Sequence, residues 1–371
     1  MEVVVVGGGV AGAAAALALE RAGIGVRVFE ARSGAQGAGA FLVVAGNGMR
    51  AVRELGVELA SGFPLRSARF CNGDGDELGV SALDGHRCVR WDELCTELRA
   101  QVRRRGVPVE HGARFVSGEQ DGDQVVARFA DGRTARGDLL IGADGVHSAV
   151  RGQLDPVPER YAGQQVFFGY SGPVDVPHVP GRIEMIRGSA GNFGWTMAPE
   201  GRAYWFARIP GPPADPRESE VDRKERLLAA LRPDATPAAD LVSATEDVLA
   251  VNARDLLPQP RWRDGRVLLV GDAAHAASPA TGQGASMAFE DAVFLAKSLR
   301  DHGNLDVYER FRRARTERNA LRSAQMTTAV SAEFAERPDE VDRLSARHTD
   351  APDDDPAALL PWDDPLPATP S

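Results

Sequence analysis

Three short stretches, far apart in the chain, combine glycines with residues suited to holding a phosphate-rich ligand. They are residues 7–12 (GGGVAG), 142–145 (GADG) and 271–275 (GDAAH). The first would open a helix whose free N–H groups and partial positive charge suit a pyrophosphate. Each of the other two places an aspartate directly after an apolar strand. Each stretch alone is a weak signal, but their order and wide spacing indicate one site built from three segments.

The first stretch lies where the pattern predicts a strand–helix–strand unit. Residues 2–6 carry consecutive valines, which is typical of a strand covered on both faces. Residues 10–22 are rich in Ala and Leu and predict a helix that ends at Gly23. Residues 25–30 predict the next strand. This is the context in which the glycine pattern becomes informative for dinucleotide binding.

Within this unit the three glycines and one acid have separate roles. Gly7 permits a tight turn, Gly9 lets the backbone approach a pyrophosphate, and Gly12 lets the helix pack closely on the strand. Glu30 ends the second strand, where a carboxylate can accept hydrogen bonds from the ribose hydroxyls of an adenosine. Its charge would repel a 2′-phosphate, so we expect FAD or NAD rather than NADP here. The alternative is that Glu30 is only a solvated strand end.

The composition narrows the classes of protein. A chain of 371 residues suggests two domains or one large domain with an insertion. The net charge of −10 disfavours nucleic acid and anionic membranes as partners. Three cysteines without a CxxC pair fit a reducing cytoplasm. We expect no signal peptide and no membrane span, because the sequence has neither a basic leader nor a long apolar run. Seven scattered histidines give no ligand spacing, so we expect no metal.

The middle of the chain predicts a second, β-rich domain. Residues 163–209 form short β-type segments that are broken by Pro and Gly and hold many of the aromatic residues. Four side chains there are candidates for an aromatic substrate pocket, namely Trp195, Met197, Tyr204 and Phe206. Strand alternation also explains these four as the core of a sheet, and this is the stronger interpretation.

With the three stretches in this order, the chain resembles the class A single-component FAD-dependent monooxygenases, the aromatic hydroxylase family typified by p-hydroxybenzoate hydroxylase. The resemblance covers residues 1–155 and 262–325. It implies an α/β fold, with a Rossmann-like FAD-binding domain and an inserted β-sheet substrate domain (α+β). We therefore expect the FAD-binding domain in 1–66, 81–162 and 262–331, and the substrate domain in 67–80 and 163–261. Residues 332–371 would be the end of a C-terminal helix and an acidic, Pro-rich tail.

The resemblance also assigns residues to the flavin. Asp144 would lie on the pyrophosphate side, Asp272 would bind the ribityl chain, and Arg90 would reach the flavin from the start of a helix. Residues 279–286 would place a helix N-terminus at the pyrimidine end of the ring, where it stabilises the anionic reduced flavin. The implied cofactor-binding residues are Gly7, Gly9, Val10, Ala11, Gly12, Glu30, Arg32, Arg90, Asp144, Asp272, Pro279, Gly282, Gln283, Gly284, Ala285 and Ser286.

Two departures from the family pattern stand out. Ser286 occupies a position where the family usually has Asn, so the contact there has a different geometry. After the glycines of 37–39 the family commonly continues to Pro-Asn before a helix, whereas this chain has Gly46-Asn47 with one extra residue. A looser loop beside the flavin would follow.

The resemblance implies a reaction and its reagents. NADPH or NADH would reduce bound FAD, and O2 would then hydroxylate an aromatic or other electron-rich small molecule through a flavin C4a-hydroperoxide. Alternatives are an epoxidase or reductase of the same fold acting on an alkene, and a non-catalytic flavin-binding sensor. His275 and Pro279 are weak catalytic candidates, and packing explains His275 equally well. We expect a monomer or homodimer with a small-molecule aromatic substrate.

Overall fold

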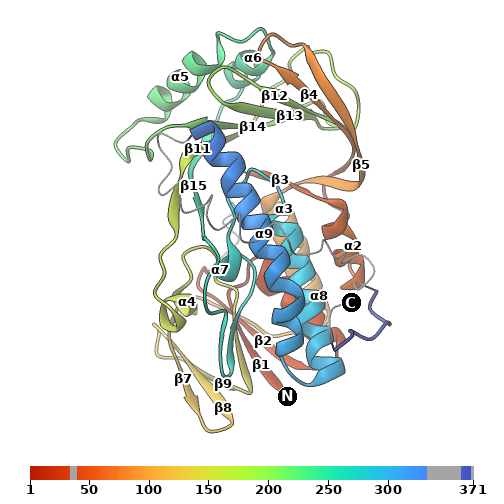
Figure 1. Ribbon diagram of the computed structural model, residues 1–371, viewed down its shortest axis with the longest axis vertical. Helices are drawn as coiled ribbons and strands as arrows, with labels where there is room; N and C mark the ends of the chain where they lie inside the picture. Colours follow the sequence, from red (N-terminus) through yellow and green to blue (C-terminus); the bar gives the residue numbers. More distant parts are fainter. Residues whose placement is uncertain (34–39, 332–360, 369–371) are drawn as a thin grey trace.

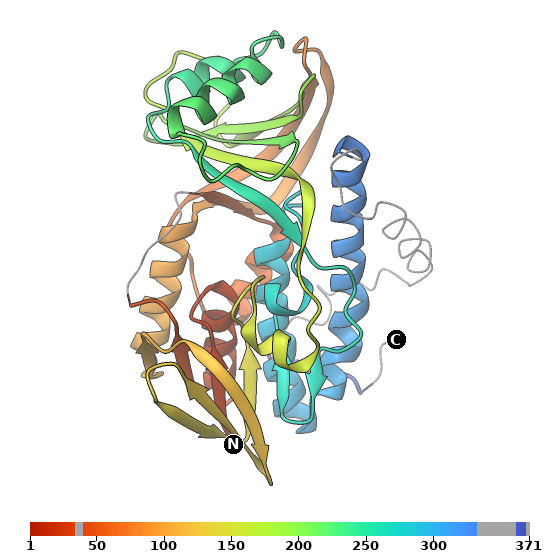
Figure 2. The same cartoon turned by 90° about the vertical axis from the view of Figure 1, so that its left-hand side faces the viewer.

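The computed structural model describes residues 1–33, 40–331 and 361–368. Figures 1 and 2 show an elongated molecule with a parallel sheet and long helices at one end and a larger sheet with two short helices at the other. The predicted α/β fold with an inserted β-sheet domain is confirmed. None of the described helices is both long and apolar enough to cross a membrane.

The first sheet is the Rossmann-like core. Its strands follow the order β16-β17-β10-β1-β2-β6, and all neighbours are parallel except β16 and β17. Their bounds are β1 Glu2–Val6, β2 Gly25–Glu30, β6 Val109–His111, β10 Leu139–Gly142, β16 Arg263–Asp264 and β17 Val267–Leu269. The predicted strand–helix–strand unit is therefore β1, α1 (Val10–Arg21) and β2, with β1 in the middle of the sheet.

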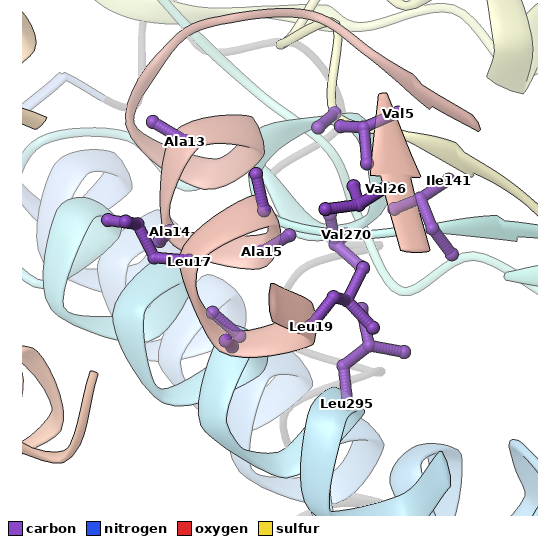
Figure 3. Close-up of a cluster of buried hydrophobic side chains, with 14 of the residues drawn as sticks. Val5, Ala13, Ala14, Ala15, Leu17, Leu19, Val26, Ile141, Val270 and Leu295 are labelled. Atoms are coloured by element: carbon purple, nitrogen blue, oxygen red, sulfur yellow. The ribbon is translucent and has the colours of Figure 1, made fainter. Parts of the chain in front are cut away.

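Helix α1 is buried between this sheet and α8 (Gly284–His302), as Figure 3 shows. Small residues, Ala13 to Ala16 and Ala18, leave room for both neighbours, whereas Leu17 and Leu19 fill the space between them. A helix that is apolar on nearly all sides needs cover on both faces. The core of this domain accordingly lies on both sides of α1.

The second sheet has eight strands in the order β15-β11-β14-β13-β12-β4-β5-β3. The strands are β3 Phe41–Val44, β4 Phe63–Asn72, β5 Glu77–Arg90, β11 Arg160–Tyr170, β12 Arg182–Arg187, β13 Asn192–Met197, β14 Ala203–Pro210 and β15 Leu249–Asp255. Helices α5 (Glu220–Leu231) and α6 (Ala238–Ser243) cover its outer face (Figure 2). The expected boundary at 67–80 is too narrow, because β4 begins at Phe63, β5 runs to Arg90 and β3 joins the same sheet.

The remaining elements surround these two sheets. A small antiparallel sheet, β7-β8-β9, lies at the far end of the Rossmann-like domain (Figure 1). The other bounds are α2 Gly46–Glu54, α3 Trp91–Arg104, β7 Phe115–Asp121, β8 Gln124–Phe129, β9 Thr134–Gly137, α4 Ala149–Leu154, α7 Asp272–His275 and α9 Asp306–Ser331. The long helix α9 runs beside α8 and reaches up to the large sheet (Figure 1).

The described end of the acidic tail packs back on the Rossmann-like domain, while residues 332–360 lie outside the described residues. The ring of Trp362 is buried between the guanidinium groups of Arg21 and Arg300, at 4.5 and 5.0 Å from its centroid. The Trp362 amide donates to Glu54 Oε2 at 2.7 Å. This short segment therefore connects α1, α2 and α8.

We expect Trp362→Ala to lower the free energy of unfolding by about 3–5 kcal/mol, because it empties a buried aromatic site. Trp362→Phe keeps most of the apolar contact and should lose less. Chemical unfolding of the apoprotein, followed by circular dichroism, measures both variants. If Trp362→Ala unfolds at the same denaturant concentration as wild type, the tail does not stabilise the domain.

Candidate functional site

The three glycine stretches meet at the carboxyl edge of the Rossmann-like sheet. Strands β1, β10 and β17 are parallel neighbours, and the register places Val6 beside Gly142 and Gly142 beside Leu269. The Ala143 amide donates to Val6 O at 2.8 Å, and the Val270 amide donates to Gly142 O at 3.0 Å. Residues 7, 143 and 271 therefore start their loops side by side, which is where open α/β sheets bind their ligands.

Two glycines of the first stretch are required by close backbone contacts. Gly7 has φ of +106°, and a Cβ on it would overlap Ala143 O. A Cβ on Gly12 would overlap Gly7 O, so the start of α1 packs directly on the loop. A Cβ on Gly9, in contrast, would meet no atom within 4 Å. Gly9 thus faces open space, as a residue that lets a pyrophosphate approach the backbone would.

The N-terminus of α1 suits an anion. No side chain caps it, and its first turn, which includes Val10 and Ala11, contains no acidic residue. The free N–H groups and the helix dipole therefore attract negative charge at this end. A diphosphate fits the residues that are present.

Glu30 stands at the end of β2, beside the glycine loop. Its Oε2 accepts from the Gly8 amide at 2.6 Å, and its Oε1 accepts from the Arg32 amide at 2.9 Å. These contacts hold the carboxylate in place rather than leaving it as a solvated strand end. The Arg32 side chain is exposed.

Arg99 is a residue that the sequence analysis missed. It projects from α3 to a small cavity that is also lined by Gly8, Val28 and Glu30, and its Nε is buried without a partner among the described residues. A buried guanidinium nitrogen without a described partner, beside Glu30, can take part in binding a ligand here. The helical pattern of 91–105 gave no reason to single out this arginine.

Asp144 has a different contact from the predicted one. Its carboxylate accepts from Ser148 Oγ at 2.5 Å, from the Ala149 amide at 2.8 Å and from the Val150 amide at 3.2 Å. These are capping bonds to the start of α4. The carboxylate therefore shapes the loop, and the backbone around Gly145, where a Cβ would meet nothing within 4 Å, is the part that faces open space.

Asp272 differs from Asp144, because no described residue donates a hydrogen bond to the Asp272 carboxylate. The side chain keeps exposed surface, yet surrounding protein raises the pKa of the carboxyl group, with Asp291 adding to this effect and His275 opposing it. The carboxyl group is therefore open to a ligand, although protein also surrounds it. An unpartnered carboxyl there fits a ligand that brings hydroxyl donors, such as a ribityl chain.

The start of α8 lies next to Asp272. A Cβ on Gly284 would be 3.9 Å from Asp272 Oδ1, and Gly282, with φ of +65°, faces open space. No side chain caps this helix. Pro279 is exposed, and Gln283, Gly284 and Ala285 are half-buried, so this stretch can present its backbone to a flavin ring.

Ser286 does not take part in that surface. It is fully buried, and its Oγ accepts from the Ala45 amide at 3.1 Å. A Cβ on Gly48 would overlap the Ser286 side chain at 2.6 Å from its Oγ, which shows how closely α2 approaches α8 here. The predicted flavin contact of Ser286 is corrected to a contact that joins α2 to α8. The glycines of 37–39, which precede this loop, lie outside the described residues.

A buried charge network behind the loop was not predicted. Asp291 accepts from the Gly271 amide at 3.0 Å, lies 2.6 Å from His275 Nε2 and accepts from Arg312 Nε at 2.8 Å. Arg312 also binds Glu290 at 2.5 Å. Burial would raise the pKa of Asp291, but His275 and Arg312 hold it well below its usual range. The mixed charges of residues 310–318 are typical of a solvated helical face, yet Arg312 is fully buried.

The same network reaches the start of α8. Asn47 Nδ2 donates to Glu290 Oε1 at 2.8 Å and to Gln283 Oε1 at 3.1 Å. His275 is buried against Trp262 at 5.4 Å between ring centroids and is engaged by Asp291. This environment supports the packing interpretation of His275 rather than a catalytic one.

Arg90 lies between the two domains. Its guanidinium binds Asp92 at 3.0 and 3.2 Å and stacks over the ring of Tyr170 at 4.8 Å. Side-chain hydrogen bonds to Asp92 raise the pKa of Arg90, which stays charged. Arg90 is therefore placed against the aromatic face of the large sheet.

The structure does not bring the four substrate-pocket candidates together. Tyr204 and Phe206 lie on the sheet face with Phe41 and Phe168. Trp195 and Met197 lie on the opposite face, in the cluster that packs under α5 and α6. Alternation along β13 and β14 decides this, because Trp195 is paired with Trp205 and not with Tyr204. Trp195 and Met197 are thus corrected to core residues of the covered face.

Comparisons with known proteins identify the family of this chain. The family described as FAD binding domain matches residues 1–323. The chain is 33% identical over 319 residues to aurachin C monooxygenase/isomerase of Stigmatella aurantiaca, covering 81% of this chain and 80% of that protein. It is 32% identical over 319 residues to the FAD-dependent urate hydroxylase of Klebsiella pneumoniae, covering 81% and 82%. The solved structure of Klebsiella pneumoniae HpxO with FAD and uric acid superimposes with a TM-score of 0.81 at 29% identity, covering 94% of this chain and 92% of that one.

Proposed function

The chain belongs to the FAD binding domain family and is an FAD-dependent monooxygenase, and from this premise we propose which residues hold FAD and where the substrate binds. The observation that carries the proposal is the unpartnered carboxyl of Asp272 beside two uncapped helix N-termini, those of α1 and α8. The substrate is an electron-rich aromatic small molecule. The buried free thiols Cys71, Cys88 and Cys95 are consistent with a cytoplasmic location.

The adenosine and diphosphate are bound at the β1–α1–β2 unit. Glu30 and Arg99 flank the adenosine side, and the backbone from Gly9 to Gly12 receives the diphosphate. The N–H groups at the start of α1 point along the helix axis and carry partial positive charge. Arg32 lies on the same side, at the exposed end of β2.

Asp272 and the start of α8 would hold the ribityl chain and the ring. Asp272 would accept hydrogen bonds from ribityl hydroxyls, and the backbone of Gly282, Gln283 and Gly284 would face the pyrimidine end of the ring. The α8 dipole stabilises negative charge that develops there. No ionisable side chain needs to react, which agrees with the engagement of His275 in the buried network.

When bound, FAD would supply the redox chemistry of a reaction in which NADH or NADPH provides a hydride, one oxygen atom of O2 enters the substrate and the other leaves as water. The protein contributes binding, orientation and exclusion of water. The aromatic face of the large sheet, with Tyr204 and Phe206, covers the substrate and keeps water from the reacting atoms.

The proposal is tested by turnover in 18O2. We expect the purified holoenzyme to oxidise NADH or NADPH faster when a phenolic or N-heteroaromatic substrate is added. Mass spectrometry of the product should show one added 18O atom per NAD(P)H consumed in the coupled reaction. If the added oxygen carries no label, or if an alkene is epoxidised while no aromatic compound reacts, the proposed hydroxylation is wrong.

A further inference from the structure

Four buried polar side chains meet behind the loop that joins α7 to α8. Ser278 lies on this loop, Ser323 and Thr327 lie one turn apart on α9, and Gln164 lies on β11. Each of the four is at most 2% exposed. Buried polar groups in native proteins are nearly always hydrogen-bonded, and these four bond to one another although they come from three distant segments. None of them is among the residues proposed to bind FAD.

Ser323 holds the main chain of the loop at two points. Its hydroxyl donates to Ser278 O, and the Thr281 amide donates to Ser323 Oγ at 3.4 Å. The Ser278 hydroxyl in turn lies 3.0 Å from Ser323 Oγ and 2.8 Å from Thr327 Oγ1. A hydroxyl donates one hydrogen and accepts up to two, so Ser323 can satisfy both main-chain contacts at once. The loop is therefore tied to α9 on both sides of residues 279–280.

The stretch held in this way leads directly into the backbone that would face the flavin. The Gly282 amide donates to Pro279 O at 3.2 Å, which closes a turn immediately before α8. After the turn, Gln283 Oε1 accepts from Asn47 Nδ2 at 3.1 Å. Ser323 thus fixes the start of the turn and Asn47 fixes its end, and the exposed backbone at Gly282 lies between these two anchors.

The same side chains connect the loop to the large sheet. Gln164 Nε2 donates to Thr327 Oγ1 at 3.3 Å, and Thr327 Oγ1 donates to Ser323 O at 2.9 Å. The pairing of β11 with β14 runs without a shift from Gln164 to Tyr170, so Gln164 lies on the same face as Phe168 and Tyr170. This is the aromatic face that the proposed function assigns to the substrate. Figure 1 shows α9 running from beside α8 up to this sheet.

We propose that Ser323 is a positioning residue for the flavin, acting through the main chain of residues 278–281. This inference rests on the proposed function, because it takes the start of α8 as the part that faces the ring. By holding the turn, Ser323 directs the free N–H groups of α8 toward the place where reduction adds negative charge to the flavin. Thr327, itself held by Gln164, supports Ser278 from the side of the large sheet.

A displaced turn should affect the two oxidation states of FAD unequally. Hydrogen bonds to a charged acceptor are stronger than those to a neutral one. Loss of the Ser323 hydroxyl leaves Ser278 O and the Thr281 amide without the partner that holds them. The N–H groups that follow then lose their aim, and binding of reduced FAD weakens more than binding of oxidised FAD.

The test measures the midpoint potential of FAD in the holoenzyme, with no substrate present. We expect Ser323→Ala to bind reduced FAD about tenfold less tightly relative to oxidised FAD, which lowers the two-electron potential by about 30 mV. Thr327→Val removes a hydroxyl at nearly constant side-chain shape and should lower the potential by less, because Ser323 still holds the main chain. Thr327→Ser keeps the hydroxyl and should keep the wild-type potential.

Ser298→Ala is the matched control for a loss of stability alone. Ser298 is fully buried on α8, and its hydroxyl also makes two main-chain contacts, donating to Asn304 O at 2.6 Å and accepting from the Tyr308 amide at 3.1 Å. It lies about 21 Å along the helix from Gly284. Both serine-to-alanine variants should have a lower Tm than wild type, but Ser298→Ala should keep the wild-type potential.

Two results would overturn the inference. One is a wild-type potential in Ser323→Ala, and the other is an equal shift in Ser298→Ala, which would make the effect one of general destabilisation. If Ser323→Ala does not retain FAD on purification, Thr327→Val and Thr327→Ser decide, and equal potentials in these two would count against positioning. None of these measurements needs turnover, so failure to hydroxylate any aromatic compound would count against the proposed function alone.

Discussion

Replacement of Asp272 by alanine is expected to leave a protein that folds but loses most of its FAD and, with it, substrate-dependent NAD(P)H oxidation. The carboxylate has no donor among the described residues, so its hydrogen bonds are made only when the ribityl chain is present. Hydrogen bonds to a charged group contribute about 1.5–3 kcal/mol, which corresponds to an increase in the FAD dissociation constant of roughly 10- to 150-fold. Titration of the apoprotein with FAD, followed by flavin fluorescence, measures this change.

Two controls separate a lost contact from a damaged fold. Asp264→Ala removes an exposed carboxylate from β16, next to the same part of the sheet, and should leave FAD affinity unchanged. The Tm of the Asp272→Ala apoprotein should stay close to that of wild type, because the side chain is exposed and no described residue donates a hydrogen bond to its carboxylate. If the variant retains both FAD and turnover, Asp272 does not bind the ribityl chain.

Arg312→Met is expected to be among the most destabilising single substitutions in the chain. The change leaves Glu290 and Asp291 buried without the cation that lies between them. Breaking a buried ion pair by removing one partner costs about 3–5 kcal/mol. We expect the lower end of this range, because Arg315 still binds Glu290 and His275 still contacts Asp291 in the variant. Urea unfolding of the apoprotein measures the loss, and Arg322→Met, which changes an exposed arginine of the same helix, should stay within about 0.5 kcal/mol of wild type.

Arg312→Met should also weaken FAD binding. Arg312 is not one of the proposed FAD-binding residues, but its ion-pair network holds several of them in position. Asp291 holds the Gly271 amide, and Glu290 holds Asn47, which in turn binds Gln283 at the start of α8. The network thus supports both the loop that carries Asp272 and the helix N-terminus beside the ring. If Arg312→Met is as stable as wild type, the Arg312 ion pairs contribute little to stability. If it is destabilised but binds FAD with wild-type affinity, the network stabilises the fold and does not position the FAD-binding residues.

Lowering the pH should weaken the ion pairs of Asp291 in the wild-type protein and so lower its stability. The pKa of Asp291 is lower in the folded protein than in the unfolded chain, so its contribution to stability is complete above the unfolded value. That contribution is lost as the pH falls below about 4, the usual value for an aspartate. Arg312→Met removes part of the cause of this shift, so its loss of stability relative to wild type should shrink in acid.

Residue patterns within one strand–helix–strand unit were sufficient to predict the part of the site that is formed by β1, α1 and β2. The run of valines, the glycines at 7, 9 and 12 and the acid at Glu30 follow one another within a single strand–helix–strand unit, and the structure places them as expected. The family resemblance supplied the fold and the cofactor, and the matched family and relatives confirm both.

Contacts between distant segments account for what the sequence did not reveal. Arg312 is buried because α9 packs on α8, and nothing in the charge pattern of 310–318 distinguishes it from the less buried arginines of that stretch. The separation of Trp195 from Tyr204 depends on the pairing register between β13 and β14, which a one-residue shift would reverse.

Amide hydrogen exchange with and without FAD tests most directly whether the three distant stretches form one FAD site. Saturating FAD should slow exchange in residues 7–12, 142–148 and 271–286 together. The small sheet β7-β8-β9, at the far end of the domain, should exchange at the same rate in both samples. Protection confined to one of the three stretches, or protection that appears only elsewhere, would contradict the account.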